Sequence, residues 1–465
     1  MIQQFIDRNE ELNFLSERFG SDSAEFIILY GRRRVGKTEI IKQFIKNKKS
    51  IYFLADRRPE AENIRELQKN MAEFLEDSLF EKVQFEDYVE LFKEFTRKIG
   101  NQRMIFVIDE FSYLMEGNKA IDSIFQKIWD EYLSKTHVFL ILCGSSISMM
   151  ESLMEYKNPL YGRRTGQWKV ELLTFRDARK FFPKYDIENQ INAFSILDGI
   201  PQYLQQFNDK KKIIENLKEK VFNKGSFLYI EPEFLLREEL REPRNYFSIL
   251  KSISFGNTTF GKIANHTQLD KTLVSKYLNT LITLHLIEKI YPITLRKEKA
   301  RDTRYKINDN FFDFWLKFIY AHKEDIEENK ANAIEKIVDA EFSTYVGRKF
   351  ESICAQFLTG LYGRNILPFK IEKTGNWWHK DNEIDIVALN GLTKEILLCE
   401  CKWQDKVNAK KILAELKEKS QYVDWNNEKR KEHYVIFAKS FKEKIKEPNL
   451  MLFDLKCMKR LYKLQ

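Results

Sequence analysis

A glycine-rich loop between an apolar segment and an amphipathic one constrains the fold of this chain most. Residues 26–30, FIILY, are typical of a buried strand, and residues 31–38, GRRRVGKT, lead into the amphipathic segment EIIKQFI. Glycines let backbone amides close around a phosphate, and the helix that follows adds the positive end of its dipole. The pattern therefore predicts a phosphate-binding loop made of Gly31, Arg32, Arg33, Arg34, Val35, Gly36, Lys37 and Thr38.

The end of this loop and a second strand predict ATP and Mg²⁺ as cofactors. The Lys37 ammonium is expected to reach the β- and γ-phosphates, and the Thr38 hydroxyl is expected to bind magnesium. Residues 104–108 form an apolar strand that ends in Asp109 and Glu110, as a Walker B strand does. Asp109 is predicted to hold the magnesium ion, and Glu110 to polarise the attacking water.

A third apolar strand, HVFLILC, runs into Gly144, Ser145 and Ser146. Its end is predicted to carry a polar residue between the Walker B strand and the γ-phosphate, and we assign Ser145 to the nucleotide site. The alternative is an ordinary serine-rich loop, because Gly and Ser also favour turns.

Five segments together resemble the prokaryotic AAA+ ATPases of the STAND-like group, and among them the MNS-type proteins with a winged helix and a C-terminal domain of the DUF234 type. The five segments are residues 5–8, 31–38, 108–110, 144–146 and 198–204. The resemblance implies an ASCE-type core, with nucleotide held between this core and a small helical lid, and self-association through the core. Because a serine stands where AAA+ proteins carry asparagine, slow hydrolysis is expected.

Two arginines follow the core strands in the segment NPLYGRRTGQW. A guanidinium suits a transferring phosphoryl group well, so either Arg163 or Arg164 can act as an arginine finger or sensor. Arg164 is our catalytic candidate, and a solvated basic turn is the alternative reading for both. From Thr174, a suitable helix N-cap, to about residue 235 the chain is predicted to form the short helices of a lid.

The segments YFSILKSISFG, TTFGKIANHTQL and DKTLVSKYLNTLITLHLIEKI predict three helices, and PITLRKEKARDTRYKI predicts a basic hairpin after them. This order is typical of a winged helix, and the apolar face of the third helix is expected to contain Leu273, Val274, Tyr277, Leu278 and Leu281. DNA is the predicted partner, and packing or regulation is the alternative role. The predicted DNA contacts are Lys271, Lys276, Arg296, Arg301 and Arg304.

A further α/β domain is expected from about residue 342. Alternate residues of a strand share a face, so Glu400 and Lys402 in ILLCECKW project together, as Glu383 and Asp385 do in NEIDIVAL. Neighbouring strands then bring carboxylates and an ammonium together, and a preceding helix adds Glu351. Such oxygen ligands suit magnesium, predicted on Asp385 and Glu400, and the lysine can orient a nucleophile.

This second set resembles the PD-(D/E)xK nuclease superfamily over residues 342–465. The resemblance implies a restriction-endonuclease-like fold with Glu351, Asp385, Glu400 and Lys402 as catalytic residues. The alternative is an inherited fold that has lost activity. Gln421 and Tyr422 are expected near the site, whereas packing or phosphate contact is expected of His379, and core packing of the aromatic residues 311–320.

Composition agrees with a large multidomain chain of 465 residues, 43% of them hydrophobic. The predicted parts are an ATPase core (1–170), a helical lid (171–236), a winged helix (237–320), a linker helix (321–341) and a nuclease-like domain (342–465). The net charge of +9 favours a polyanionic partner only mildly, since 69 acidic residues stand against 78 basic ones. No apolar run of about 18 residues is present, so no membrane partner and a cytoplasmic location are expected. The five cysteines are expected to be reduced.

The prediction is an AAA+ ATPase that binds DNA and cleaves it with a magnesium-dependent C-terminal nuclease. The rival hypothesis is an ATP-dependent regulatory switch of the STAND type, in which the C-terminal fold only binds a partner.

Overall fold

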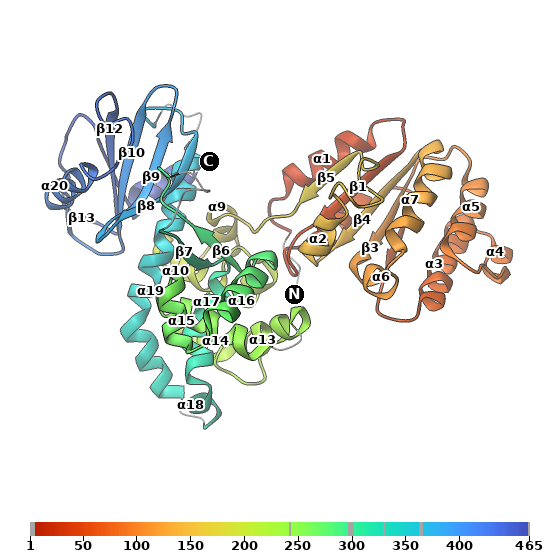
Figure 1. The fold of residues 1–465 in the computed structure, drawn as a ribbon, viewed down its shortest axis with the longest axis horizontal. Coiled ribbons are helices and arrows are strands. Elements are labelled where there is room, and N and C mark those ends of the chain that lie inside the picture. Colours follow the sequence, from red (N-terminus) through yellow and green to blue (C-terminus); the bar gives the residue numbers. More distant parts are fainter. Residues whose placement is uncertain (1–4, 241–242, 296–301, 329–330, 362–365, 464–465) are drawn as a thin grey trace. The chain divides into compact units, whose positions relative to one another are not determined.

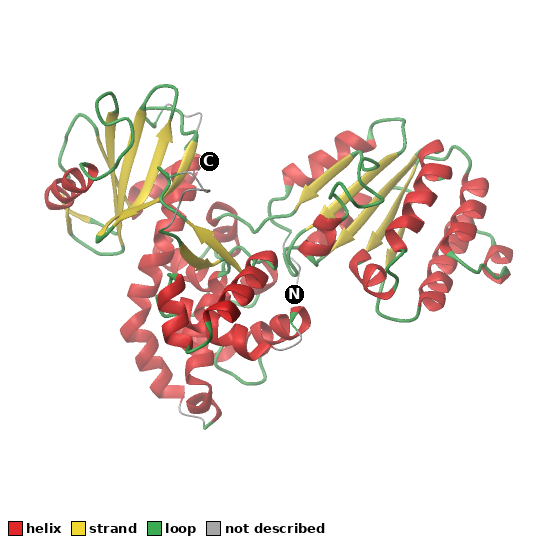
Figure 2. Cartoon of the chain, in the orientation of Figure 1, coloured by secondary structure: helices red, strands yellow, loops and turns green. Residues whose placement is uncertain are grey.

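A computed structural model describes residues 5–240, 243–295, 302–328, 331–361 and 366–463. The chain divides into two compact units, Met1–Leu172 and Leu173–Gln465, which are considered separately (Figures 1 and 2). The predicted α/β class is confirmed: the first unit is built on a parallel sheet and the second contains a sheet of its own. The boundaries of the five parts drawn from the sequence stay predictions.

The first unit has a five-stranded sheet in the order β2-β3-β4-β1-β5, and all of its neighbouring strands run parallel. Because β4 lies between β1 and β3, its carboxyl end separates the glycine-rich loop from the Walker B residues. The strands are β1 (Glu25–Tyr30), β2 (Ser50–Leu54), β3 (Met104–Asp109), β4 (Val138–Gly144) and β5 (Gly166–Lys169).

Helices cover both faces of this sheet, which explains why its central strands are apolar at nearly every position. Alternate residues of β1 enter different cores: Phe26 and Ile28 pack on one face, and Ile27 and Leu29 on the other. The helices of this unit are α1 (Asn9–Phe19), α2 (Lys37–Ile45), α3 (Glu60–Leu75), α4 (Ser78–Lys82), α5 (Tyr88–Ile99), α6 (Phe111–Gly117), α7 (Ile121–Glu131) and α8 (Ile147–Ser152). The core with Ile27 includes residues of α1 and α2, and the core with Phe26 includes residues of α3, α5, α6 and α7.

The second unit begins with helices where a lid and a winged helix are predicted. Within it, Gly199 approaches the backbone of Leu173 so closely that a Cβ at this position would lie 1.8 Å from the Leu173 carbonyl oxygen. The helices are α9 (Phe175–Ala178), α10 (Ile187–Leu197), α11 (Pro201–Leu204), α12 (Ile213–Lys220), α13 (Phe227–Glu239), α14 (Pro243–Ser254), α15 (Phe260–Thr267) and α16 (Lys271–Thr283).

Two antiparallel strands follow α16, as the sequence predicts. They are β6 (Ile287–Ile290) and β7 (Arg304–Ile307), which we call the hairpin together with residues 291–295. The apolar face predicted for α16 is correct for Val274, Leu278 and Leu281, which are buried, but wrong for Leu273, which is 42% exposed. Leu273 lies in the first turn of the helix, before the packed stretch begins.

The helices α17 (Asn310–Phe314), α18 (Lys323–Glu327) and α19 (Ala331–Gly360) lead to the second sheet. Of the aromatic residues predicted to be core, Phe311, Phe312, Phe314, Trp315 and Phe318 are buried, and Tyr320 is partly buried. The helix α19 joins the two parts of this unit: the Tyr345 hydroxyl donates to the carbonyls of Ser195 (3.1 Å) and Asn310 (2.7 Å). Further along α19, Phe350 and Phe357 pack against Phe437 of the sheet.

The second sheet is mixed and has the order β14-β12-β10-β9-β8. Its strands β8, β9 and β10 are antiparallel neighbours, whereas β10, β12 and β14 run parallel. The elements are β8 (Lys373–His379), β9 (Asn382–Asn390), β10 (Glu395–Lys402), β11 (Val407–Asn408), α20 (Ala409–Ser420), β12 (Lys431–Ala438), β13 (Phe441–Glu443), β14 (Leu450–Asp454) and α21 (Leu455–Lys463). Leu413 and Leu416 of α20 belong to a core that includes Ile396 and Leu398 of β10.

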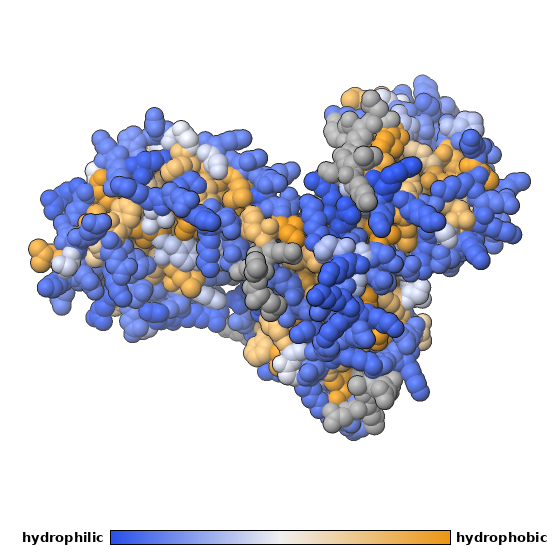
Figure 3. Space-filling view, turned by 180° about the vertical axis from the view of Figure 1, so that it is seen from behind, coloured by the Kyte–Doolittle hydropathy of each residue, from blue (hydrophilic) through white to orange (hydrophobic). Residues whose placement is uncertain are grey.

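Four of the five cysteines are buried and all five are free, as expected. Hydrophilic residues cover much of the surface seen in Figure 3. Within the described ranges, no helix is both long enough and apolar enough to cross a lipid bilayer.

Candidate functional site

The glycine-rich loop connects β1 to α2, and its two glycines serve different purposes. A Cβ at position 31 would lie 2.4 Å from the carbonyl oxygen of Val170, so only glycine permits the close approach of these two chain segments. Gly36 has open space around it but a φ of 97°, a left-handed conformation that glycine adopts without strain. The helix α2 begins at the next residue, Lys37, so its N-terminal amides open onto the loop.

The Lys37 ammonium is held inside the loop. Its Nζ donates to the carbonyl oxygens of Gly31 and Arg32, both at 2.9 Å, and the residue is 5% exposed. Phosphate oxygens bound by the loop amides would compete with these carbonyls for the ammonium. Beside it, the Arg33 guanidinium donates to the Tyr113 hydroxyl at 3.2 Å.

The predicted magnesium ligands meet across the sheet. The Thr38 hydroxyl donates to Oδ2 of Asp109 at 2.9 Å. Thr38 lies in the first turn of α2, which follows β1, and Asp109 ends β3, with β4 between these two strands. Asp109 is 1% exposed and also accepts from the Tyr52 hydroxyl at 2.6 Å. Burial, and then the Asp109 carboxylate, raise the pKa of Tyr52, so its phenol stays protonated and keeps donating. This arrangement fits a magnesium–nucleotide complex, since a hydroxyl and a carboxylate are the hard oxygen ligands that magnesium takes.

Glu110, the predicted catalytic carboxylate, follows Asp109 in a left-handed conformation with a φ of 55°. Its Oε2 accepts from the Ser145 hydroxyl at 2.7 Å and from the Ser145 backbone amide at 3.3 Å. The structure therefore places Ser145 at the end of β4 beside Glu110, which is where the sequence pattern put a polar residue.

Arg8 supports the glycine-rich loop through a hydrogen bond to its backbone, a role that was not predicted from the sequence. Its guanidinium donates to the Val35 carbonyl (2.8 Å), to the Glu171 carbonyl (2.9 Å) and to the Glu11 carboxylate (2.9 Å), and the residue is 6% exposed. The only signal in the sequence was its place in one of the family segments, because a long-range contact with a backbone carbonyl leaves no local pattern.

The two candidate arginines of the segment NPLYGRRTGQW have different partners. Arg163 forms an ion pair with Asp130 at 3.1 Å, and the Arg164 Nε donates to the Gln167 side chain at 2.5 Å. Both are partly exposed. The structure gives neither a contact with the residues of the glycine-rich loop.

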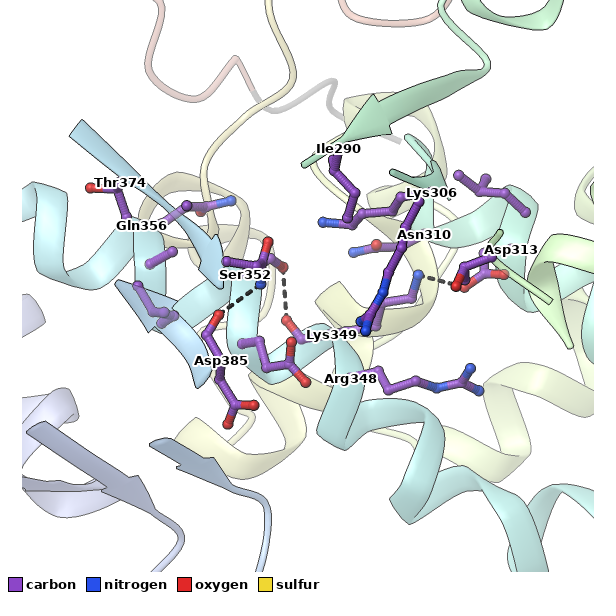
Figure 4. A pocket seen from close by; sticks show the side chains of 18 of the residues that line it. Ile290, Lys306, Asn310, Asp313, Arg348, Lys349, Ser352, Gln356, Thr374 and Asp385 are labelled. Atoms are coloured by element: carbon purple, nitrogen blue, oxygen red, sulfur yellow. Dashed lines mark hydrogen bonds and ion pairs between the residues drawn. The ribbon is translucent and has the colours of Figure 1, made fainter. Parts of the chain in front are cut away.

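In the second unit, the structure brings Asp385 of β9 next to β10, as expected. Its Oδ2 accepts from the backbone amide of Cys401 at 2.7 Å. Burial, the Cys401 side chain and Glu400 raise the pKa of Asp385 to about 8. Burial and Asp385 raise the pKa of Glu351 on α19 well above its ordinary value. Asp385 and Glu351 line one cavity, and Figure 4 labels Asp385 there.

The other predicted pair, Glu400 and Lys402, is joined by a 2.7 Å ion pair on β10. Burial lowers the pKa of Lys402, but the hydrogen bond and charge of Glu400 raise it overall. Lys419 of α20 contacts both oxygens of Glu400 at 3.2 Å, and the sequence reading missed it. Gln421 and Tyr422, expected near this site, are exposed instead, because they follow the last turn of α20.

The carboxylates of this site are hard oxygen ligands of the kind that magnesium takes, but they do not form a group of three. Across the ranges that the structure describes, no three His, Cys, Asp or Glu side chains are grouped so that they can hold a metal ion. Glu400 is held by two ammonium groups, and Asp385 by a backbone amide. The expected convergence is therefore partial: Glu400 pairs with Lys402, and Asp385 interacts electrostatically with Glu351, Glu400 and Lys402.

The predicted DNA contacts divide into three groups. Lys271 and Lys276 are exposed on α16, as expected for a groove-facing helix. Arg304 is instead paired with Glu383 at 2.9 Å. Arg296 and Arg301 lie outside the described residues.

Comparison with known proteins places the chain in a family. A family model for an ATPase domain found predominantly in Archaea matches residues 5–207, and a second, DUF234, for archaeal and bacterial proteins of unknown function, matches residues 315–412. The uncharacterized protein MJECL04 of Methanocaldococcus jannaschii is 37% identical over 454 residues, which cover 97% of this chain and 99% of that protein. The chain belongs to this archaeal ATPase family.

Other members and neighbours of the archaeal ATPase family agree with this assignment. The uncharacterized ATP-binding protein MJ0423 of the same organism is 56% identical over 48 residues, which are 10% of this chain and 81% of that protein. The Walker-type ATPase paby2304 of Pyrococcus abyssi has the same type of fold, with a TM-score of 0.50 and 21% identity over 67% of this chain and 96% of that chain. The predicted ATPase and DUF234 parts are confirmed, and the STAND-like and nuclease assignments stay predictions.

The role of Arg8 generates a prediction about the first unit. Arg8→Met should lower the free energy of unfolding by about 3 kcal/mol, because it leaves Glu11 and two carbonyls without their donor. It should also weaken ATP binding, since the Val35 carbonyl is part of the loop. Thermal unfolding and calorimetric titration with ATP measure both effects.

The matched control is Arg18→Met in α1, the helix that begins directly after Arg8. The ion pair of Arg18 with Glu25 is longer, at 3.2 Å, and its side chain is 35% exposed. This variant should lose less than about 1 kcal/mol. Equal losses of unfolding free energy in the two variants would show that Arg8 does not support the glycine-rich loop.

Proposed function

We propose that the first unit binds ATP with magnesium and hydrolyses it slowly. The observation that carries this proposal is the 2.9 Å contact between the Thr38 hydroxyl and Asp109, which joins the phosphate-binding loop to the Walker B strand. Membership of the archaeal ATPase family supports it, and so does the name of the relative MJ0423, an ATP-binding protein.

Each residue has one task in this proposal. The loop amides and Lys37 bind the phosphates, and Thr38 and Asp109 hold the magnesium ion, which neutralises phosphate charge when bound. Glu110 accepts from Ser145 at Oε2, which leaves Oε1 as the oxygen that orients and polarises water.

Two substitutions separate binding from hydrolysis. Lys37→Ala should abolish detectable ATP binding, whereas Glu110→Gln should bind ATP normally and hydrolyse it at least about a hundredfold more slowly, as expected when a group that activates water is lost. Calorimetry and phosphate release measure the two quantities. An unchanged rate of ATP hydrolysis in Glu110→Gln would show that another residue activates the attacking water.

We also propose that the second unit binds nucleic acid and cleaves a phosphodiester. One observation favours cleavage: residues from α19, β9 and β10, predicted together from the sequence, lie in one neighbourhood, with Asp385 against the backbone of β10 and Glu351 electrostatically linked to Asp385. Exposed Lys271 and Lys276 on α16 supply charge for phosphate contacts. The rival is a regulatory switch in which this unit binds without cleaving.

The cleavage hypothesis predicts that plasmid nicking needs both Asp385 and Lys402. Asp385→Ala and Lys402→Ala should each remove most of the activity seen with magnesium or manganese, because one loses a partly buried carboxylate and the other the ammonium paired with Glu400. Chelation of the metal should stop nicking as well. ATP hydrolysis without DNA should survive both changes.

Lys411→Ala is the matched control, because Lys411 lies on the exposed side of α20 and its one ion pair within the described part of the chain is with Glu415, at 3.7 Å. It should cleave like the parent. No nicking of any DNA by the parent would leave the switch as the better account, and equal nicking by all variants would point to a contaminant.

A further inference from the structure

A cavity of about 820 Å³ lies within the second unit. Its walls come from the hairpin, from α19 and from strands β8 and β9. Figure 4 shows Ile290 and Lys306 of the hairpin on one side, Thr374 and Asp385 of the sheet on the other, and Ser352 of α19 in the middle of the view.

The hairpin is fastened to the edge of the sheet, so this wall is a built part of the unit. The Ile293 backbone amide donates to the Asn376 carbonyl of β8 at 2.9 Å, and Lys373 donates to the Ile293 carbonyl at 2.8 Å. The Ile293 side chain is 4% exposed and belongs to the hydrophobic core of the sheet. These contacts pair part of the free edge of β8, as edge strands require.

Arg304 strengthens the same junction. Its guanidinium pairs with Glu383 of β9 at 2.9 Å and lies 4.4 Å from the centre of the Trp378 ring. The basic hairpin strand β7 therefore faces the sheet and the cavity.

The charges of the cavity leave Arg348, and a weakly held Lys306, for a ligand. Five basic side chains line it, and four have acidic partners: Arg304 with Glu383, Lys349 with Asp313 (2.5 Å), Arg176 with Asp177 (3.6 Å) and Lys306 with Glu288 (3.9 Å). The Lys306 pair is the longest of the four and both of its side chains are 48% exposed, so a ligand phosphate can compete for this ammonium. Arg348 forms no ion pair with any residue that the structure describes.

The remaining lining suits a planar, partly apolar group. Ile290, Ile307 and Ile386 line the cavity, and so does Trp378, whose buried indole nitrogen has no hydrogen-bond partner among the described residues. Glu351 and Asp385 offer acceptors for hydroxyl or amino groups. A ligand that combines an anion, hydroxyl groups and a flat ring would satisfy all three kinds of wall.

We propose that this cavity binds a nucleoside phosphate, with Lys306 and Arg348 on the phosphate and the base beside Ile290, Ile307 and Trp378. The ligand is either a free nucleotide or the phosphorylated end of a nucleic-acid strand, which present the same chemistry. The hairpin supplies half of the phosphate contacts, so binding depends on its docking against β8. The proposal depends on neither ATP hydrolysis nor strand cleavage.

The test uses the full chain with Lys37→Ala, so that the ATP site does not contribute. Binding of AMP, and of a 5′-phosphorylated oligodeoxynucleotide with its unphosphorylated counterpart, is measured by calorimetry in this background and after adding Lys306→Ala or Arg348→Ala. Each added change should weaken binding roughly tenfold, the usual cost of one charged hydrogen bond. The control is Lys289→Ala, an exposed lysine of the same hairpin outside the cavity, which should not weaken it.

The outcomes separate the two sources. Binding of AMP that Lys306→Ala weakens identifies a free-nucleotide site, and binding only of the phosphorylated oligonucleotide identifies a strand-end site. The proposal is overturned if neither of the two probes binds, or if affinity is unchanged in both Lys306→Ala and Arg348→Ala. Neither of these results bears on ATP hydrolysis. Circular dichroism of each variant confirms that it is folded.

Discussion

The contact between Thr38 and Asp109 is the interaction on which the first unit depends. It can form only if β1 and β3 run parallel with β4 between them, so that their carboxyl ends reach one edge of the sheet. The surrounding features serve this edge. Gly31 allows β5 to pass beside the loop, Arg8 ties the loop to α1 and to the Glu171 carbonyl, and Ser145 holds Glu110 next to the same edge.

In the second unit, the corresponding constraint is the continuity of α19. The middle of this helix is bonded to α10 and α17 through the Tyr345 hydroxyl, and its C-terminal half packs on the sheet through Phe350 and Phe357. The hairpin meets the same sheet at β8. Segments predicted as a winged helix, a linker and a nuclease-like domain are therefore packed together, and Arg304, which was expected to contact DNA from a separate wing, instead lines a cavity together with Asp385.

Sequence patterns predicted what depends on neighbouring residues and on periodicity. The phosphate-binding loop, the Walker B strand, the place of Ser145 and the alternation that separates Glu400 from Cys401 all follow from local spacing. Tyr52, Arg8 and Lys419 were missed because each acts through a contact between distant segments. Arg304 was assigned to DNA because a basic hairpin gives no sign of the partner that it packs against, here Glu383 and Trp378. Leu273 was misplaced because helical periodicity does not show where packing begins.

The most direct test of the account is the magnesium dependence of ATP binding in Asp109→Asn. This change keeps the shape of the side chain, so its contacts with Thr38 and Tyr52 can still form. It removes the negative charge that would hold the magnesium ion. Titration with ATP, with and without magnesium, should show a gain in affinity from magnesium in the parent and little or none in Asp109→Asn, whereas binding without magnesium should persist in both. A full magnesium-dependent gain in Asp109→Asn would contradict the proposed site.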